Sequence, residues 1–272
     1  MNMRAGIYFN RNYITDNKPY VEKIERELTG RGHKVRVVES FKDLDGLDIL
    51  FVLGGDGTIL LVAAECAVRK IKIIGINYGH VGFLTEFEPE KIDDAIALVC
   101  DGKYKIQRRN MLEITFADRH YLALNDLVVQ RSTGGNDFSN TVNIHAEIDG
   151  ATVDNFSSDG LIISTPTGST AYSLAAGGSV LAPELEAFIL TPICAHSLHS
   201  RPVVFSDKST LTVSPVNAKA PLVIAIDGRV VDGIKEGEKI TLKRAKSAVE
   251  FITAGDKNFF NKLLLKLNIW SK

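Results

Sequence analysis

Hydrophobic residues along the first hundred positions alternate between two spacings, one typical of strands and one typical of helices. Short apolar stretches that indicate buried strands occupy residues 5–9, 33–38, 48–53 and 71–76. Residues 20–28 carry apolar side chains at helical spacing with the charges outward, and a second helical pattern begins after Thr58. This alternation predicts a parallel sheet covered by helices, with ligands at the carboxyl ends of its strands.

Beyond Gly102 the apolar residues recur at every second position, which predicts strands with one buried face. These stretches occupy residues 112–116, 121–129, 142–148, 161–165, 211–213, 222–226 and 240–242. Asp-Gly pairs such as Asp227-Gly228 mark turns between them. Residues 257–267 return to helical spacing without a partner strand, so we expect this last helix to pack back on the first domain.

The length of 272 residues is enough for two ordinary domains that each have a core. We predict an α/β N-terminal domain with a parallel sheet over residues 1–105, completed by the C-terminal segment 255–272. A mostly-β C-terminal domain would then occupy residues 106–254. The composition, 45% hydrophobic and 24% charged, is that of a soluble globular protein.

The net charge of −1 gives the chain no general attraction for polyanions. Basic residues cluster at 103–109 and 239–246, but hydrophobic residues interrupt both clusters, as on solvated surface strands, so we expect no nucleic-acid binding. Cys66, Cys100 and Cys194 lack paired or metal-type spacing and fit buried thiols in a reducing compartment. The N-terminus has no signal-peptide core, and no apolar stretch approaches the roughly 18 residues of a membrane span. We therefore expect a cytoplasmic protein without a membrane partner.

The most informative motif is Gly-Gly-Asp-Gly-Thr at residues 54–58, between a strand pattern and a helix pattern. Its glycines lack Cβ atoms and let backbone N–H groups approach an anion, which the positive end of the helix dipole also favours. Asp56 stands out, because phosphates repel a carboxylate unless it holds Mg²⁺ or accepts a proton from an attacking hydroxyl. The turn therefore suggests phosphoryl transfer, and a role for Asp56 as a helix cap stays open.

Two better-known phosphate motifs fit this turn poorly. A Walker loop requires a lysine before its serine or threonine, and none is present here. A dinucleotide fingerprint that begins at Gly55 would have Leu60 at its third glycine position. The next strand also ends at Asn77 without the acid that binds ribose.

Asn125 and Asp126 interrupt an otherwise apolar strand. Buried amide and carboxylate groups need partners, which a ligand rich in hydroxyls and ring nitrogens would supply. In a regular strand the two side chains point to opposite faces, so joint ligand binding requires a strand end or a bulge. A turn or an edge strand is an equal alternative.

Residues 159–178 predict a strand, a Pro-Thr-Gly turn and a short helix that Ser169 can cap and two glycines end. Six serine and threonine hydroxyls fall within residues 164–173, where they can bind phosphate or sugar, and Tyr172 offers a flat face for a ring. Capping and turn formation account for two or three of these hydroxyls but not for all.

Two further candidates carry less weight. Cys194, His196 and His199 suggest a metal site, but no fourth ligand is evident. His80 follows the strand at 71–76 and could touch a ligand, although a loop histidine bound to the backbone is the preferred interpretation.

Taken in order, the motifs at residues 54–58, 77–84, 125–126 and 159–172 resemble the bacterial NAD kinases, and the match runs along nearly the whole chain. The first motif alone also resembles diacylglycerol and sphingosine kinases and, more distantly, phosphofructokinases. The segment Asp-Gly-Leu…Thr-Pro-Thr-Gly-Ser-Thr-Ala-Tyr, which ends at Tyr172, is similar to NAD kinases in particular.

The resemblance implies transfer of a phosphoryl group from ATP, or in some members polyphosphate, to the 2′-hydroxyl of the adenosine ribose of NAD, yielding NADP. It implies Mg²⁺ bridging the donor phosphates, a homo-oligomer (dimer or tetramer), and Asp56 as the base at the hydroxyl. The implied phosphate-binding residues are Gly54, Gly55 and Thr58. The implied NAD-binding residues are Gly57, Asn125, Asp126, Asp159, Thr167, Thr170, Ala171, Tyr172 and Ser173.

The chain departs from the family pattern at three positions. Some members carry arginine at the positions of Leu61 and Ser157, and serine at the position of Ala175. Two other functions are alternatives. A lipid kinase would need an apolar acyl slot, whereas the segment 159–173 is dense in hydroxyls. A non-catalytic dinucleotide-binding regulator would not need Asp56 in the turn.

Overall fold

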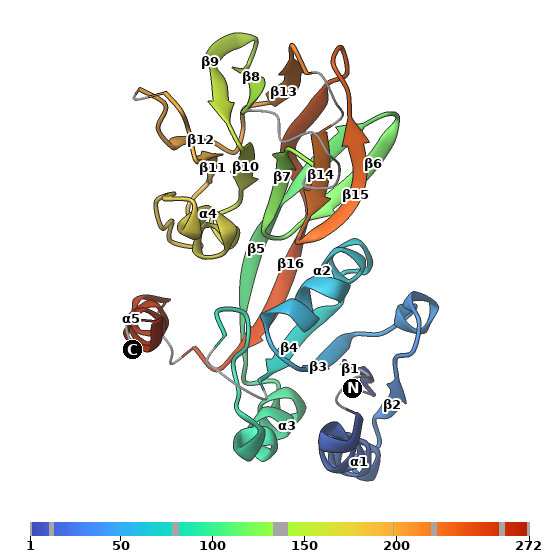
Figure 1. Ribbon diagram of the computed structural model, residues 1–272. Coiled ribbons are helices and arrows are strands. Elements are labelled where there is room, and N and C mark those ends of the chain that lie inside the picture. The colour runs from blue at the N-terminus through green and yellow to red at the C-terminus, as the bar shows by residue number, and fades with distance from the viewer. Residues whose placement is uncertain are drawn as a thin grey trace. The chain divides into compact units, whose positions relative to one another are not determined.

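The structure is a computed structural model that describes residues 2–10, 14–77, 82–132, 141–197, 199–218, 222–255 and 259–270. The chain divides into two compact units. Unit 1 comprises Met1–Arg109 and Ser247–Lys272, and unit 2 comprises Asn110–Lys246. Figure 1 labels the helices and strands of both. Among the described residues, no helix combines the length and the apolar composition needed to cross a membrane.

Unit 1 is built on a parallel sheet whose strand order is β2-β1-β3-β4, followed by the end of β16. Its strands are β1 (Arg4–Phe9), β2 (Lys34–Val37), β3 (Ile49–Leu53), β4 (Lys72–Ile76) and the end of β16 (Ile240–Thr253). Its helices are α1 (Ile14–Gly30), α2 (Asp56–Arg69), α3 (Ile92–Asp101) and α5 (Phe259–Trp270), with 3₁₀ turns at Phe41–Leu44 and Pro89–Lys91.

Different helices cover the two faces of this sheet (Figure 1). On one face, Ile24 of α1 and Ile96 of α3 share a core cluster with Phe51 of β3. The neighbouring strand residues Leu50 and Val52 point to the opposite face, since side chains alternate along a strand, and they are fully buried. α2 covers that face and thereby places its N-terminus at the carboxyl edge of the sheet.

Unit 2 contains two antiparallel arrangements of strands. One sheet has the order β12-β11-β10-β7-β14-β15, and β16, β13, β8 and β9 follow one another in the other, where β5 pairs with β16 and β6. Its strands are β5 (Lys105–Phe116), β6 (Arg119–Ala123), β7 (Asp126–Gln130), β8 (Val142–Ile148), β9 (Ala151–Ser158), β10 (Gly160–Ser164), β11 (Ala187–Ile193), β12 (Val203–Ser206), β13 (Leu211–Val216), β14 (Leu222–Ile226), β15 (Arg229–Ile234) and β16. A 3₁₀ turn (Gly168–Thr170) and the short helix α4 (Tyr172–Ala175) follow β10.

The core of unit 2 lies between these two sheets. Leu112 of β5 and Ile144 of β8 belong to the same buried cluster as Val129 of β7 and Ile163 of β10. The predicted fold class, an α/β domain with a parallel sheet and a mostly-β domain, is confirmed. The predicted docking of the last helix is also confirmed, because Lys262 of α5 donates to the carbonyl of Thr85 within unit 1.

The hydrophobic pattern along the chain did not predict every element, and it merged two strands, β6 and β7, into one. Residues 121–129 do not form one strand, since β6 ends at Ala123 and β7 begins at Asp126. The long strands β5 and β16 extend well beyond the predicted 112–116 and 240–242, because much of their length carries charged side chains that hide the alternation. The elements without a prediction are α3, β9, β11, β12 and β15.

Candidate active site

The glycine turn at residues 54–58 links the carboxyl end of β3 to the first turn of α2. Gly54 adopts a φ of +150°, and a Cβ there would lie 2.4 Å from Thr58 Oγ1, so the turn requires glycine at this position. The N-cap of α2 is Gly55, whose carbonyl oxygen accepts the Thr58 N–H at 2.9 Å. A helix N-terminus with a glycine cap presents backbone N–H groups toward the space in front of it.

Asp56 is the first residue of α2, but its carboxylate does not cap that helix. Oδ2 accepts the backbone N–H of Phe83 at 2.8 Å, and Oδ1 accepts that of Leu84 at 3.0 Å. These two hydrogen bonds fix the orientation of the carboxylate from a segment 27 and 28 residues away in sequence. The Asp56 side chain is still 28% exposed, so a ligand can reach it.

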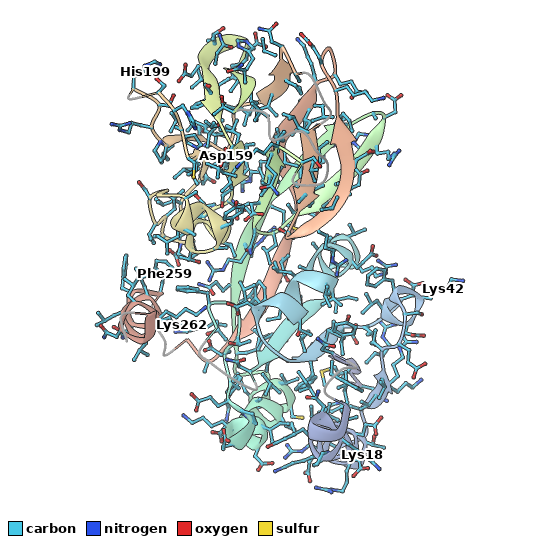
Figure 2. All side chains as sticks on the ribbon, viewed as in Figure 1. Lys18, Lys42, Asp159, His199, Phe259 and Lys262 are labelled. Carbon is cyan, nitrogen blue, oxygen red and sulfur yellow. The ribbon has the colours of Figure 1, made fainter. Side chains whose placement is uncertain are left out.

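A lysine from the far end of the chain completes the surroundings of Asp56. Lys266 Nζ lies 3.5 Å from Asp56 Oδ2 and 4.4 Å from the centre of the Phe83 ring. One turn earlier on α5, Lys262 Nζ donates to the Thr85 carbonyl at 2.9 Å and pairs with Glu86 Oε2 at 3.2 Å. Figure 2 marks Lys262 on this helix. Unit 1 thus brings the start of α2, residues 83–86 and α5 together.

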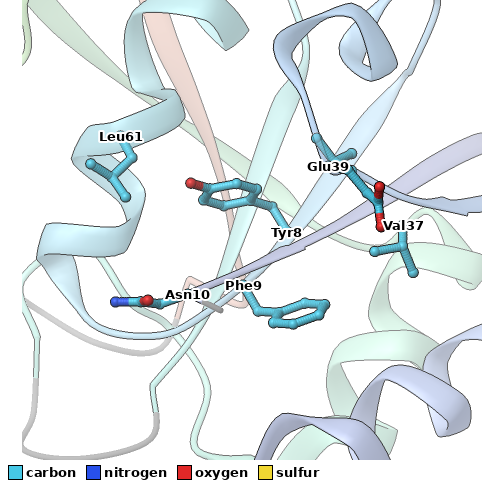
Figure 3. Close-up of a pocket in the computed structure, with 7 residues that line it drawn as sticks. Tyr8, Phe9, Asn10, Val37, Glu39 and Leu61 are labelled. Carbon is cyan, nitrogen blue, oxygen red and sulfur yellow. The ribbon is translucent and has the colours of Figure 1, made fainter. Parts of the chain in front are cut away.

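A pocket of about 530 Å³ opens at the carboxyl ends of β1 and β2 in unit 1. Figure 3 shows Leu61 of α2 on one side of it and Glu39, which follows β2, on another. Its lining consists of Tyr8, Phe9, Asn10, Val37, Val38, Glu39 and Leu61. Phe9 pairs with Leu53 of β3, so the pocket begins one strand away from the glycine turn. Its apolar walls with a few polar groups are typical of small-molecule sites.

In unit 2, Asn125 lies between β6 and β7, and Asp126 is the first residue of β7. The carboxylate of Asp227, in the turn between β14 and β15, accepts the backbone N–H groups of Leu124, Asn125 and Asp126 at 2.9, 2.7 and 3.2 Å. Asn125 therefore lies in a break between two strands, a position compatible both with the strand end that ligand binding requires and with the alternative of a turn. From the sequence, Asp227 is predicted only as a turn residue. Nothing in the sequence indicates that its carboxylate binds three backbone N–H groups.

The carboxyl groups of Asp126 and Asp227 are both deeply buried. Burial, and then the charge of Asp227, raises the pKa of Asp126 to about 7. Burial also raises the pKa of Asp227 above its usual value, and the three backbone N–H groups oppose that rise. Two neighbouring buried carboxyl groups disfavour ionisation of both, which is why the pKa of Asp126 lies above its usual value.

The hydroxyl-rich segment after β10 lies against the Asn125 corner. The Thr165 N–H donates to the Asn125 carbonyl at 2.9 Å, and the Thr165 hydroxyl donates to the Leu124 carbonyl at 2.6 Å. A Cβ at Gly168 would lie only 2.3 Å from the Asn125 carbonyl oxygen, so glycine permits this close approach. Unit 2 therefore brings Asn125 and Asp126 together with the segment that begins at Thr165.

Most hydroxyls in this segment bind protein groups, more than the two or three expected. Thr170 Oγ1 donates to the Thr167 carbonyl at 3.1 Å, and Ser173 Oγ lies 2.9 Å from Thr191 Oγ1. Ser169 does not cap α4, because its hydroxyl accepts the Leu181 N–H at 2.9 Å instead. The hydroxyls are needed inside the fold because they satisfy backbone groups that β10 and its turn bury.

The remaining predicted site residues in unit 2 differ in accessibility. Tyr172 is 42% exposed and Ala171 precedes it at the start of α4, while Asp159 pairs with Arg131 at 3.2 Å. Figure 2 marks Asp159. The glycine turn belongs to unit 1. His80 and the rest of residues 78–81 lie outside the described residues.

The described part of the chain contains no group of three His, Cys, Asp or Glu side chains that could hold a metal ion. Of the residues considered as a metal site, Cys194 is exposed, and His199 Nδ1 lies 2.7 Å from Ser197 Oγ.

Comparisons with known proteins agree with both units. Residues 10–104 match the family model of the ATP-NAD kinase N-terminal domain, and residues 124–254 match that of the ATP-NAD kinase C-terminal domain. An NAD kinase of Carboxydothermus hydrogenoformans is 36% identical over 245 residues, which cover 88% of this chain and 86% of the relative. An NAD kinase of Methanothermobacter thermautotrophicus is 34% identical over 84% of this chain and 79% of the relative.

Solved structures of the same kind share the fold. The crystal structure of an NAD kinase from Archaeoglobus fulgidus in complex with ATP has a TM-score of 0.79 and 27% identity, and the match covers 97% of this chain and 99% of that one. A yeast NADH kinase complexed with NADH has a TM-score of 0.84 over all of this chain and 89% of its own, but at 22% identity it shows the fold alone. Since family models match both units and the relatives match along most of their length, the chain belongs to the NAD kinase family and is a kinase that phosphorylates NAD to NADP.

Proposed function

We propose that the protein transfers the terminal phosphoryl group of ATP to the 2′-hydroxyl of the adenosine ribose of NAD, with Asp56 as general base. The hydroxyl oxygen bonds to the γ-phosphorus as the bond to the β–γ bridging oxygen breaks, and ADP leaves. The hydroxyl proton passes to the Asp56 carboxylate. The observation that carries this proposal is the Asp56 carboxylate, which two backbone N–H groups hold in place while it stays accessible.

Gly54, Gly55 and Thr58 are proposed to bind the phosphates. The φ of Gly54 and the glycine cap at Gly55 support this assignment, because they expose backbone N–H groups at the positive end of α2. Mg²⁺ that arrives with the donor nucleotide would supply positive charge that neutralises the donor phosphates. The described carboxylates do not gather into a metal cage, which favours a cation held mainly by the nucleotide.

The pocket beside the turn is the proposed position of the donor nucleoside. The sheet order reverses between β1 and β3, and ligands of open α/β sheets bind at such a switch point. The rings of Tyr8 and Phe9 and the side chain of Leu61 offer flat apolar walls for a base, and Glu39 could accept hydrogen bonds from ribose hydroxyls. The crystal structure of the Archaeoglobus fulgidus relative is a complex with ATP, which supports ATP as the donor.

The NAD-binding domain is proposed to comprise residues 106–254. Support comes from the contacts that hold Asn125 and Asp126 against the segment after β10. The residues proposed to bind NAD are Gly57, Asn125, Asp126, Asp159, Thr167, Thr170, Ala171, Tyr172 and Ser173. Because several hydroxyls there already bind protein groups, the backbone and the exposed Tyr172 ring are expected to supply much of the contact.

A homo-oligomer, dimer or tetramer, is proposed from the family resemblance, and a cytoplasmic location is proposed from the cysteines, which lack paired spacing. Light scattering of the purified protein measures the oligomer directly, and a monomer at micromolar concentration would contradict that part of the proposal.

The decisive assay incubates the protein with ATP, Mg²⁺ and NAD and measures NADP. Tripolyphosphate replaces ATP in a parallel reaction, and diacylglycerol replaces NAD in another. Formation of NADP with ATP supports the proposal, whereas phosphorylation of the lipid alone would favour a lipid kinase. Absence of product with every donor would contradict any kinase assignment.

Replacing Asp56 with Asn keeps the size and one acceptor oxygen of the side chain but removes the base. We expect kcat to fall by about 10²- to 10⁴-fold, since that is the usual contribution of a general base. The fold and the Kd for NAD should stay close to wild type, as circular dichroism and calorimetry can check. Near-normal turnover in this variant would rule out Asp56 as the base.

A further inference from the structure

Helix α5 places an ammonium group beside the proposed base. Lys266 Nζ lies 3.5 Å from Asp56 Oδ2, and the lysine side chain is only 18% exposed. The same ammonium sits 4.4 Å above the centre of the Phe83 ring, and Phe83 is also a residue whose backbone N–H binds Asp56. Two independent contacts, an ion pair and a cation–π contact, therefore hold Lys266 at Asp56.

Other contacts attach α5 to unit 1, so Lys266 is not needed as its anchor. Lys262, one turn earlier, pairs with Glu86 Oε2 at 3.2 Å, and the other oxygen of Glu86 accepts the Thr253 hydroxyl at 2.7 Å. The Phe259 ring lies 6.0 Å from that of Phe83. The helix is thus secured at its first turns, and Lys266 extends from the secured part toward the glycine turn.

The charges at this place indicate what Lys266 does. A carboxylate at the mouth of a phosphate-binding turn repels the donor phosphates at short range, and a paired ammonium cancels most of that repulsion. An ammonium is a compact charge with three N–H donors on a flexible stem. It can therefore contact a phosphate oxygen that arrives next to Asp56 while α5 itself stays in place.

We propose that Lys266 is a further residue of the phosphoryl-transfer site, which offsets the charge of Asp56 as the donor binds and donates a hydrogen bond to the transferred phosphoryl group. The inference rests on the proposed role of Asp56. The proton of the ribose hydroxyl goes to Asp56, so Lys266 is assigned no part in the proton transfer. Its N–H groups stabilise the charge that spreads over the phosphoryl oxygens in the transition state.

The first test compares two lysines of the same helix. Lys266→Met removes the ammonium but keeps an apolar stem, and we expect kcat to fall by roughly 100-fold, as for loss of one donor to a developing oxyanion. Lys262→Met removes a similarly buried charge one turn away. This variant should lower the thermal midpoint of unfolding while its kcat stays close to that of the wild type. Equal losses of kcat and of thermal midpoint in both variants would show that Lys266 only holds the helix and would overturn the proposal.

The second test measures anion binding without catalysis. Calorimetry with inorganic tripolyphosphate should give a Kd about tenfold weaker for Lys266→Met than for the wild type, as for loss of one charge-assisted hydrogen bond. Lys266→Arg keeps the charge and should restore most of the affinity, while Lys262→Met should bind like the wild type.

This binding test separates the two proposals. If the protein makes no NADP but Lys266→Met still weakens tripolyphosphate binding, the catalytic proposal fails and Lys266 remains a phosphate-binding residue. An unchanged tripolyphosphate Kd in Lys266→Met would overturn the inference about Lys266 whatever the activity of the wild type.

Discussion

At the scale of single residues, the buried carboxyl pair in unit 2 has a direct thermodynamic consequence. Asp126 is 4% exposed and its pKa is raised to about 7, mainly by burial and then by Asp227. An acid whose folded pKa lies above its unfolded value binds more protons in the folded state. The free energy of unfolding therefore falls as the pH rises from about 4 to about 7.

Replacing Asp126 with Asn removes this titration, because the carboxyl group is exchanged for an uncharged amide of similar size. We expect Asp126→Asn to gain stability relative to the wild type as the pH rises, by about 1 to 3 kcal/mol between pH 4 and 8. Urea unfolding at several pH values measures the difference. A variant whose stability tracks that of the wild type across this range would show that Asp126 is ionised in the folded protein.

Some residue-scale features were predictable and others were not. Asp56 stands out in the sequence because it puts a negative charge in a turn of the kind that binds phosphate, which repels a carboxylate. Lys266 and Asp227 give no such signal, since a lysine in a C-terminal helix and an aspartate before glycine are ordinary at their own positions. Only contacts with residues far away in sequence reveal what they do.

At the scale of elements, the segment after β4 holds the side chain of Asp56, the first residue of α2, in position. Its N–H groups at Phe83 and Leu84 bind Asp56, and Gly82 lies so close that a Cβ there would be 2.3 Å from Asp56 Oδ1 and 2.5 Å from Thr85 Oγ1. The absence of a side chain at Gly82 is thus part of what positions the carboxylate.

Gly82→Ala should displace the Asp56 carboxylate without damage to a core. We expect kcat to fall by about tenfold to 100-fold, because a misplacement of about 1 Å at a reacting group has effects of this size. Gly30→Ala is the matched control, since a Cβ at Gly30 meets nothing within 4 Å. Steady-state kinetics on both variants decide the matter, and unchanged turnover in Gly82→Ala would mean that the carboxylate position is not critical.

The sequence predicted whether an element is a helix or a strand more accurately than it predicted the first and last residues of that element. The parallel strands β3 and β4 of unit 1 were predictable because both of their faces are buried, which leaves short apolar runs. The long strand β16 was not, because its alternation is broken by Lys243, Arg244 and Lys246. The break between β6 and β7 was also hidden, since its cause is the distant carboxylate of Asp227.

At the scale of the whole molecule, the proposed nucleoside pocket and Tyr172, a proposed NAD-binding residue, belong to different units. The pocket with Leu61 lies in unit 1, whereas the exposed ring of Tyr172 lies in unit 2. Each unit has its own core, so a substitution in one should leave the other intact. Substitutions at Leu61 and at Tyr172 should therefore each alter KM for a different substrate.

Leu61→Trp and Tyr172→Ala test this separation as a pair. Filling the pocket with tryptophan should raise KM for ATP about tenfold while KM for NAD and the use of tripolyphosphate, which lacks a nucleoside, stay near wild type. Tyr172→Ala should do the reverse and raise KM for NAD by a similar factor. If Leu61→Trp alters KM for NAD instead, the pocket does not hold the donor.

The sequence by itself determined the fold class, the family and the phosphate turn, because these depend on local patterns: the alternation of apolar residues, the glycines and the order of motifs along the chain. The tertiary structure decided how Asp56 is oriented, what binds it and why the pKa of Asp126 is raised to about 7. Those properties arise from groups that are about 30 to 200 residues apart in sequence, where burial and close contact set hydrogen bonding and charge.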